Sequence, residues 1–315
     1  MALPKGMRKP PRKGKIGKKV AYFKGCALEG PARDYDASAR LVAKALGLEL
    51  DQLEDFNCCG SLHVKNLSFK ASLLLGARNF SVARAQGHGA LVAPCNGCSF
   101  ALKRAERLLS DEGKLSELNR LLEEAGERPV DELPQAHHLL EWLYNEAGPE
   151  EVKKNAVRPL KGLKVACYYG CLYGMPRVFS GAYPHASKEE ELAVPYGRET
   201  ADDDEHPYYM DALLEAAGAE TVELGPYATS CCGSYFSLVE PELARSMALK
   251  VLKEAHARGA RLLAVACPAC KLSLETALAR HEDLKLSVVY FTQLLALAFG
   301  HPPGSLGLTE EAWAG

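Results

Sequence analysis

The amino-acid sequence predicts an α/β protein with two tandem, pseudo-symmetric domains, each built on a small, mostly parallel sheet flanked by helices. Short apolar runs of strand length alternate along the chain with segments of helix length, which is the pattern of α/β units. This pattern occurs twice within 315 residues, a length sufficient for two domains with their own cores. Ten of the eleven cysteines follow the same duplication.

The duplication is clearest in the cysteines. Each copy contains a single cysteine, a Cys-Cys-Gly triplet and a Cys-x-x-Cys pair. Between the triplet's second cysteine and the Cys-x-x-Cys pair lie 35 residues in the first copy and 34 in the second. The first set is Cys26, Cys58, Cys59, Cys95 and Cys98, and the second is Cys171, Cys231, Cys232, Cys267 and Cys270. A rare residue repeated in this register indicates thiols placed for chemistry.

The elements around the cysteines repeat in the same order. Each copy predicts a strand ending in Gly-Cys, a helix ending at a glycine, a buried strand that delivers the Cys-x-x-Cys pair, and a closing short β-like run with an amphipathic helix. In the first copy these are residues 19–26, 41–47, 90–95 and 134–145. In the second they are residues 164–171, 213–218, 263–267 and 292–299. This alignment pairs Cys26 with Cys171, so that Cys167 alone lies outside the pattern.

The strand ends predict where the cysteines gather. Parallel sheets hold their ligands at the carboxyl ends of strands, and cysteines follow three of the four strand ends that can be read from the sequence. Pseudo-symmetric halves bring equivalent strand ends together. We therefore expect both sets of cysteines to face a region shared by the two halves.

The repeat also sets the expected domain boundaries. We expect a basic, disordered tail over residues 1–18, an N-terminal domain over 19–150, a C-terminal domain over 163–300 and a C-terminal tail over 301–315, with a charged boundary segment at 148–162. The first and second cysteines are separated by 31 residues in the first copy and by 59 in the second. The surplus is an insertion at about residues 175–204, and an insertion of this length in a compact domain is either functional or disordered.

Composition narrows the class of protein. A hydrophobic fraction of 47% and a net charge of −2 are ordinary for a soluble globular protein and give no sign of nucleic-acid binding. The basic tail is not followed by the apolar stretch of a secretory signal, and no run approaches the roughly 18 apolar residues of a transmembrane segment. We expect a cytoplasmic protein, in which clustered cysteines bind metal or carry out redox chemistry rather than form disulfides.

Five thiols in each copy favour a multinuclear metal centre. A zinc site or a cubane [4Fe–4S] cluster uses four ligands and leaves one thiol of each set unused. Adjacent cysteines of a strand point to opposite faces, so the Cys-Cys pair suits two irons or a bridge between them. The residues alone favour iron–sulfur and leave zinc open. We expect helices to begin after Gly60 and after Cys98 and Cys270, with their N-terminal N–H groups facing the thiolates.

At this point the sequence resembles a known family. Two five-cysteine CCG domains in tandem are similar to the B subunit of heterodisulfide reductase over residues 17–300, and Tyr22-Phe-Lys-Gly-Cys26 and Tyr168-Tyr-Gly-Cys171 resemble that family's segments around the first cysteine. The Lys24–Glu29 region and the insertion look closer to the bacterial branch linked to sulfur oxidation than to the methanogen enzyme. The chain departs from the family in its basic tail, its insertion and Tyr173-Gly174, where His-Leu is expected.

The resemblance implies a function. It implies an oxidoreductase component that reduces or forms a disulfide or related sulfur substrate, such as a sulfur carrier. It also implies that each complete set of five cysteines holds a noncubane [4Fe–4S] cluster, with zinc in one site as an alternative. The implied partners are the flavin-containing A subunit and the ferredoxin-like C subunit of such a complex. The sequence has no G-x-G-x-x-G and no P-loop, so it brings no nucleotide fingerprint of its own.

Other functions compete with this one. A zinc- or cluster-bearing anchor or assembly subunit of a respiratory dehydrogenase is one alternative, and an electron-transfer subunit of a lactate or glycolate oxidase is another. Cys167 is expected to be a core residue, and His137-His138 are expected on a helix in surface or core roles. His185 and His206 lie in or beside the insertion, where they are weaker candidates for substrate contact.

Overall fold

The computed structural model describes residues 16–174, 202–203, 206–281 and 283–309. The tail up to residue 15 and nearly all of the expected insertion, including His185, lie outside the described residues. Within them, two four-stranded sheets have the equivalent strand orders β2-β1-β3-β4 and β6-β5-β7-β8, and every pairing is parallel. The α/β fold predicted from the sequence is confirmed.

The N-terminal half contains the first sheet and its helices. Its two central strands are buried along most of their length, as expected for a parallel sheet covered on both faces. In chain order the elements are β1 (Lys19–Tyr22), α1 (Gly25–Glu29), α2 (Arg33–Ala45), β2 (Glu49–Gln52), α3 (Leu62–Leu67), α4 (Phe69–Ala85), β3 (Ala90–Ala93), α5 (Asn96–Leu109), α6 (Glu112–Glu124), β4 (Gln135–His138), α7 (Leu139–Glu146) and α8 (Gly148–Asn155).

The C-terminal half repeats this order in its described residues, apart from α6, which has no counterpart there. Where α3 follows the first Cys-Cys-Gly triplet, the second triplet is followed by a short 3-10 helix. The elements are β5 (Lys164–Tyr168), α9 (Cys171–Gly174), α12 (Tyr209–Ala216), β6 (Glu220–Val222), η1 (Gly225–Thr229), η2 (Ser234–Phe236), α13 (Pro241–Ala257), β7 (Leu262–Val265), α14 (Pro268–Leu278), β8 (Ser287–Tyr290), α15 (Phe291–Ala298) and η3 (Pro303–Leu306).

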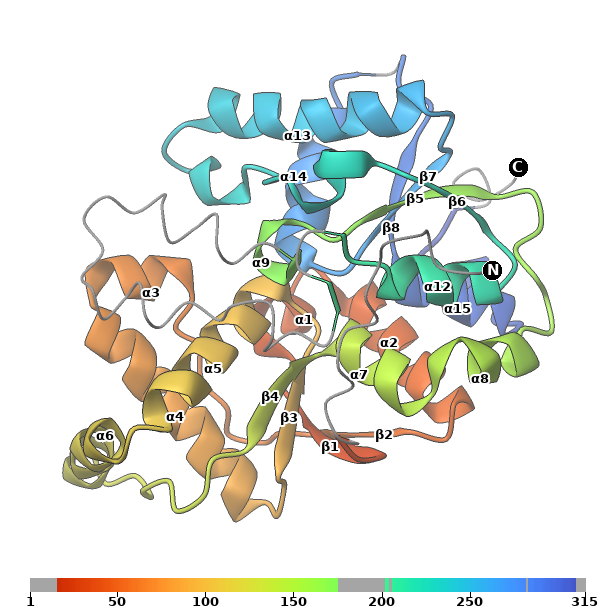
Figure 1. Ribbon diagram of the computed structural model, residues 1–315. Helices are drawn as coiled ribbons and strands as arrows, with labels where there is room; N and C mark the ends of the chain where they lie inside the picture. Colours follow the sequence, from red (N-terminus) through yellow and green to blue (C-terminus); the bar gives the residue numbers. More distant parts are fainter. Residues whose placement is uncertain (1–15, 175–201, 204–205, 282, 310–315) are drawn as a thin grey trace.

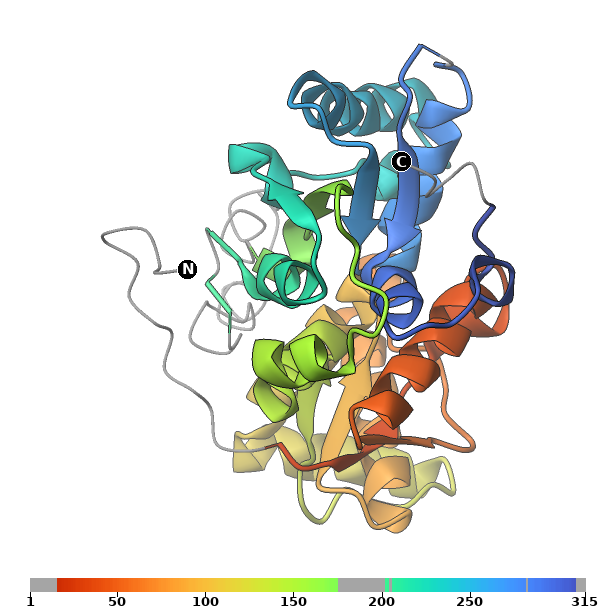
Figure 2. The same ribbon diagram turned by 90° about the vertical axis from the view of Figure 1, so that its right-hand side faces the viewer.

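Helices from both halves form the layer between the two sheets. Helix α2 packs against α15, and α7 and α8 pack against α12 (Figures 1 and 2). One hydrophobic core runs through this layer from Val20 and Tyr22 of the first sheet to Leu263 and Val265 of the second. A second core, around Phe80 and Leu102, fills the outer face of the N-terminal sheet. The two halves therefore share a core, which fixes the cysteines of one half relative to those of the other.

The charged boundary segment at residues 148–162 contains a helix. Helix α8 occupies Gly148–Asn155 and buries Val152. Acidic residues in its first turn and lysines in its last turn suit the helix dipole. None of the helices in the described part of the chain is long and apolar enough to cross a membrane.

Candidate metal centre

Each half delivers its five cysteines from the carboxyl edge of its sheet. The first cysteine lies in the short helix after the first strand, as Cys26 does in α1 and Cys171 at the start of α9. The Cys-Cys-Gly triplets lie in loops before α3 and η2. The Cys-x-x-Cys pairs follow β3 and β7 directly. All four central strands therefore lead to cysteines, whereas the sequence placed cysteines at three of the four strand ends read from it.

The start of the Cys-x-x-Cys helices corrects the sequence prediction. Helices α5 and α14 begin at Asn96 and Pro268, between the two cysteines of each pair rather than after the second. Cys95 and Cys267 are the N-cap residues, with extended backbone angles. The second cysteine then lies in the first helical turn, on the same side as the N-cap. Both sulfurs are thus presented at the helix N-terminus, where partial positive charge favours thiolates.

The thiols of the N-terminal half form a row of contacts. Hydrogen bonding to Cys59 raises the pKa of Cys58, while hydrogen bonds from Cys58 and Cys98 hold the pKa of Cys59 well below its usual value. Cys98 in turn contacts Cys59 and Cys95, and both contacts raise its pKa. Cys26 lies close enough for its charge to act on Cys58.

The C-terminal half contains the same row. Hydrogen bonds from Cys231 and Cys270 lower the pKa of Cys232. Contacts with Cys171 and Cys232 raise the pKa of Cys231, and contacts with Cys232 and Cys267 raise that of Cys270. In both halves the buried second cysteine of the triplet is therefore the thiolate that its neighbours stabilise.

The two rows meet at the interface between the halves. The sulfurs of Cys95 and Cys267 are 3.9 Å apart. Hydrogen bonding to Cys267 is the largest effect on Cys95 and raises its pKa, whereas hydrogen bonds from Cys270 and Cys95 lower the pKa of Cys267. The structure thus brings the cysteines predicted from the sequence into one continuous row. Within the described residues, no three His, Cys, Asp or Glu side chains surround a single point as ligands of one metal ion would.

Backbone N–H groups face the sulfurs in both halves. Gly60 donates to Cys58, and Gly233 donates to Cys231 at 3.4 Å. The next residues along the chain, Ser61 and Ser234, donate their N–H groups to the second cysteine of the triplet. Such donors stabilise negative charge on sulfur, which suits thiolate ligands of a metal or cluster.

Two glycines leave room beside the sulfurs. Gly25 and Gly170 precede the first cysteine of each set and have φ angles of +65° and +75°. A Cβ on Gly25 would lie 3.1 Å from the sulfur of Cys98, and one on Gly170 would lie 3.1 Å from the sulfur of Cys270. Any side chain here would be strained and would crowd a sulfur. The close approach of the backbone to the sulfurs at both glycines and the ten soft donors fit an iron–sulfur group.

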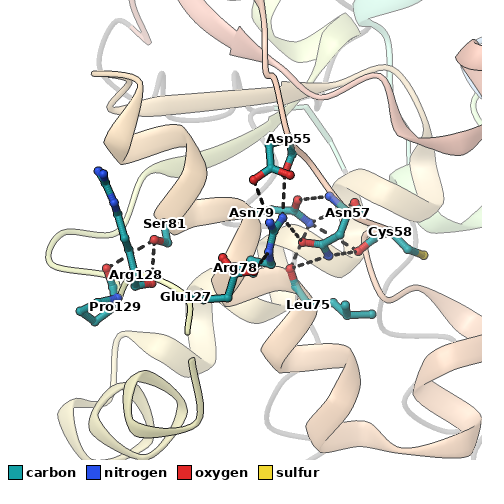
Figure 3. Close-up of polar contacts among 10 residues, drawn as sticks. All are labelled: Asp55, Asn57, Cys58, Leu75, Arg78, Asn79, Ser81, Glu127, Arg128 and Pro129. Atoms are coloured by element: carbon teal, nitrogen blue, oxygen red, sulfur yellow. Dashed lines mark hydrogen bonds and ion pairs between the residues drawn. The ribbon is translucent and has the colours of Figure 1, made fainter. Parts of the chain in front are cut away.

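The Cys-Cys-Gly loop of the N-terminal half is anchored by α4 (Figure 3). Asn79 is fully buried, accepts the N–H of Asn57 at 3.0 Å and donates to the carbonyl groups of Asn57 and Cys58, both at 3.4 Å. The neighbouring Arg78 donates to the Asp55 carbonyl and carboxylate and pairs with Glu127 at 2.9 Å. Asp55 has a φ of +56°, so this clamp also holds a strained backbone.

The C-terminal loop has different anchors. Tyr168 of β5 donates to the Ser230 carbonyl at 2.6 Å, and Ser273 of α14 donates to the Cys232 carbonyl at 2.6 Å. The residue equivalent to Asn79 is Val251, counting from the close contacts of Gly60 with Ser72 and of Gly233 with Ala244. Val251 is a buried core residue. The two triplets are therefore held by unrelated side chains.

A buried charged pair between α5 and α7 was missed by the sequence analysis. Lys103 of α5 donates to Glu141 of α7 at 2.6 Å, and both side chains are less than 8% exposed. Although burial opposes it, the charge of Lys103 holds the pKa of Glu141 well below its usual range. Burial lowers the pKa of His138 to about 4, and the charge of Lys103 adds to the effect. The sequence carried no signal for this pair, because Ser99, Glu106 and Arg107 make the same face of α5 look polar.

The remaining candidates have clear locations. His137 and His138 end strand β4, and His138 caps α7, so their expected place on a helix was wrong. Both are buried, on opposite faces of the strand. Cys167 is buried in β5 and contacts Asp211, as expected for a core residue. His206 is exposed, and its backbone N–H donates to Asp203.

Comparisons with known proteins agree with the duplicated site. The profile of the cysteine-rich domain family CCG matches residues 20–103 and 197–275. The chain is 30% identical over 303 residues to the B subunit of the Ferredoxin/F(420)H(2)-dependent CoB-CoM heterodisulfide reductase of Methanosarcina acetivorans, covering 93% of each chain. It is 27% identical over 300 residues to the 8-methylmenaquinol:fumarate reductase membrane anchor subunit of Wolinella succinogenes, covering 93% of this chain and 96% of that one.

The fold also occurs among solved structures. A hypothetical protein from Helicobacter pylori aligns with 95% of this chain at a TM-score of 0.65 and 14% identity. This chain spans about half of that protein, 52% of its length. At this identity the similarity shows the fold alone.

Proposed function

The chain belongs to the family of heterodisulfide reductase B subunits and carries two CCG domains, and on this basis we propose that it is the iron–sulfur catalytic subunit of a heterodisulfide-reductase-like complex. The reaction would be reduction or formation of a disulfide. The observation that carries the proposal is the continuous row of thiols, which joins the two halves through Cys95 and Cys267, 3.9 Å apart.

The proposed ligands are the ten cysteines of the two sets. One centre would be held by Cys26, Cys58, Cys59, Cys95 and Cys98, and the other by Cys171, Cys231, Cys232, Cys267 and Cys270. We propose noncubane [4Fe–4S] clusters, with zinc in one site as the alternative. Sulfurs in pairwise contact suit a multinuclear centre, because neighbouring irons can take different thiolates. Such centres supply and accept electrons one at a time.

A disulfide matches two such centres. Its reduction takes up two electrons and two protons and gives two thiols, and two adjacent centres can exchange two electrons. We propose that the substrate, a disulfide or a sulfur-carrier thiol, binds where the two rows meet. The near contact of Cys95 with Cys267 supports this location, because it brings the two sets within the reach of one small molecule.

The electrons would come from other proteins. The relative in Methanosarcina acetivorans is named as one lettered subunit of a reductase, which supports a complex of several subunits. We propose two partners, one resembling the flavin-containing A subunit and one resembling the ferredoxin-like C subunit. A cytoplasmic location is part of the proposal, because ten ligands must stay as free thiolates.

Metal analysis and a redox assay test this function. Protein purified anaerobically should contain about eight irons and a similar amount of acid-labile sulfide per chain, four for each set. It should be brown and should release thiols from disulfides when a low-potential reductant is supplied. Colourless protein with zinc alone would contradict the proposal. Protein with one cluster and one zinc would show that the two sets bind different metals.

A second function is favoured by one comparison. The relative in Wolinella succinogenes is named as a membrane anchor subunit of a fumarate reductase. A chain of this kind would pass electrons between a quinol and a partner without acting on sulfur. Intact clusters together with no disulfide reduction under any reductant, and tight binding to a membrane or a dehydrogenase, would favour this function over the first.

A further inference from the structure

The two halves differ at the residue that follows the first cysteine of each Cys-x-x-Cys pair. Asn96 follows Cys95 and Pro268 follows Cys267, and each is the first residue of its helix. The backbone before them is nearly the same. Cys95 has φ −125° and ψ 129°, and Cys267 has φ −142° and ψ 125°. The difference is therefore confined to the side chain and to one N–H group.

That N–H group crosses the interface. The first N–H groups of a helix have no partner within the helix. Cys95, the N-cap of α5, places its sulfur 3.9 Å from that of Cys267, so the N–H of Asn96 faces the sulfur of Cys267 and helps to lower its pKa. Proline has no N–H, so Pro268 cannot return such a bond to Cys95. Each sulfur also receives the N–H of the second cysteine of its own pair, Cys98 or Cys270. Cys267 thus has a donor that Cys95 lacks.

The side chain of Asn96 fixes this arrangement. It is 2% exposed, and its amide donates to the carbonyl oxygen of Tyr169 in the other half at 2.6 Å. A Cβ on Gly170 would lie 3.2 Å from the same amide nitrogen, so glycine is needed for the approach. The residue of the N-terminal half that is equivalent to Tyr169 is Lys24. Its side chain pairs with Asp36 of its own half at 3.3 Å.

We propose that Asn96 is a positioning residue that gives the C-terminal centre the higher reduction potential of the two. The proposal rests on the proposed function, because it takes Cys95 and Cys267 as ligands of separate iron–sulfur centres. Reduction adds negative charge to a centre and its sulfurs, and an N–H donor stabilises that charge. The hydroxyl of Ser234 donates to Cys232 and acts in the same direction. An electron entering the pair would then rest first on the C-terminal side.

Exchanging the two residues tests the inference in the full-length, cluster-loaded chain. Asn96→Pro removes the N–H and should fold, because proline is favoured at the first helical position and Cys267 already precedes a proline in the same backbone conformation. It should lower the reduction equilibrium constant of the C-terminal centre about tenfold, which is about 59 mV for one electron. Asn96→Ala keeps the N–H and should shift the potential less.

Pro268→Ala is the reciprocal variant. It restores an N–H group opposite Cys95 and should raise the potential of the N-terminal centre, which narrows the gap between the two. The potentials would be measured by redox titration followed by electron paramagnetic resonance. Each centre would be assigned with Cys59→Ser and Cys232→Ser, which leave the other centre in place.

The outcomes separate the inference from the function on which it rests. The inference would be overturned if two centres are present and the difference between their reduction potentials is unchanged in both Asn96→Pro and Pro268→Ala. The proposed function would then remain intact. Equal shifts in Asn96→Pro and Asn96→Ala would also overturn it, because the side chain rather than the N–H would then be responsible. Iron and sulfide analysis comes first, and a chain that binds no cluster would overturn both.

Discussion

The two halves of the chain have the same five-cysteine arrangement but hold it with different residues. In the N-terminal half, Asn79 and Arg78 of α4 clamp the loop before the Cys-Cys-Gly triplet. In the C-terminal half, the phenol of Tyr168 and the hydroxyl of Ser273 do so. The difference teaches that the sulfur positions are constrained by the repeat, whereas their supports have diverged. The two sites can therefore be altered one at a time.

Removal of one buried thiol should have the largest effect. Cys59→Ser should remove about half of the iron, because the N-terminal set then lacks the thiolate that its neighbours Cys58 and Cys98 stabilise. Cys232→Ser should remove the other half. Iron content and the electron paramagnetic resonance spectrum of each variant would be measured. Cys167→Ser is the control and should keep all of the iron. Loss of both centres from either single variant would mean that the ligands are shared between the halves.

Loss of the N-terminal clamp should be the next largest effect. Asn79→Leu keeps the branched shape of the side chain but leaves the N–H of Asn57 without this partner, while the carbonyl of Cys58 keeps its bond from the Asn57 side chain at 2.7 Å. Leaving such a group unpaired costs about 1–3 kcal/mol. We expect a loss of about 1–3 kcal/mol in the free energy of unfolding, measured by urea denaturation, and a lower iron content in the N-terminal site alone.

The C-terminal half offers the matched control. Val251→Ala, at the equivalent position of α13, should also lower stability, by about 1–2 kcal/mol, because it removes buried methyl groups. It touches no hydrogen bond of the triplet loop, so both centres should stay fully loaded. If Asn79→Leu keeps all of its iron while losing stability, Asn79 supports the fold but not the ligands.

The sequence predicted which cysteines come together better than it predicted their surroundings. Cysteine spacing and the repeat of apolar strands predicted the fold class, and the structure brings Cys95 and Cys267 together across the interface. The start of the helices was misplaced, because an N-cap cysteine has extended backbone angles that spacing does not reveal. Lys103 and Glu141 were missed for a related reason, since they become partners only when α5 and α7 pack together.

The halves also differ in the charged residues of α2 and α12, the equivalent helices of the two halves. Arg40 of α2 pairs with Asp36 at 3.0 Å, whereas the equivalent helix position in the second half holds Asp211. Asp211 faces the hydroxyl of Tyr169, the thiol of Cys167 and Glu215 of its own helix. Burial raises the pKa of Asp211 to about 6. Its protonated form is thus favoured in the folded state.

This difference predicts a pH dependence. Because the folded pKa lies above the unfolded value, Asp211 contributes stability at low pH that is lost as the pH rises through about 6. Between pH 5 and pH 8 this loss is about 1.4 kcal/mol. The side chain in Asp211→Asn cannot ionise, so the variant should not show this loss. Between pH 5 and pH 8 its free energy of unfolding should fall by about 1.4 kcal/mol less than that of the unaltered protein. Parallel pH curves for the two proteins would show that Asp211 is already charged in the folded state.

The smallest expected effect comes from making the C-terminal loop resemble the N-terminal one. Tyr168 is equivalent to Phe23, and Tyr168→Phe removes only the bond from its hydroxyl to the Ser230 carbonyl. We expect a loss of about 1 kcal/mol in the free energy of unfolding with no loss of iron, because Ser273 still holds the Cys232 carbonyl.

The reverse exchange, Phe23→Tyr, should bring no matching gain. The carbonyl that its hydroxyl would approach belongs to Asn57, which already accepts a hydrogen bond from Asn79. Urea denaturation of both variants with iron analysis would measure the two effects. A gain of about 1 kcal/mol in Phe23→Tyr would mean that the clamp from Asn79 leaves this carbonyl open, and that the two loops differ less than their anchors indicate.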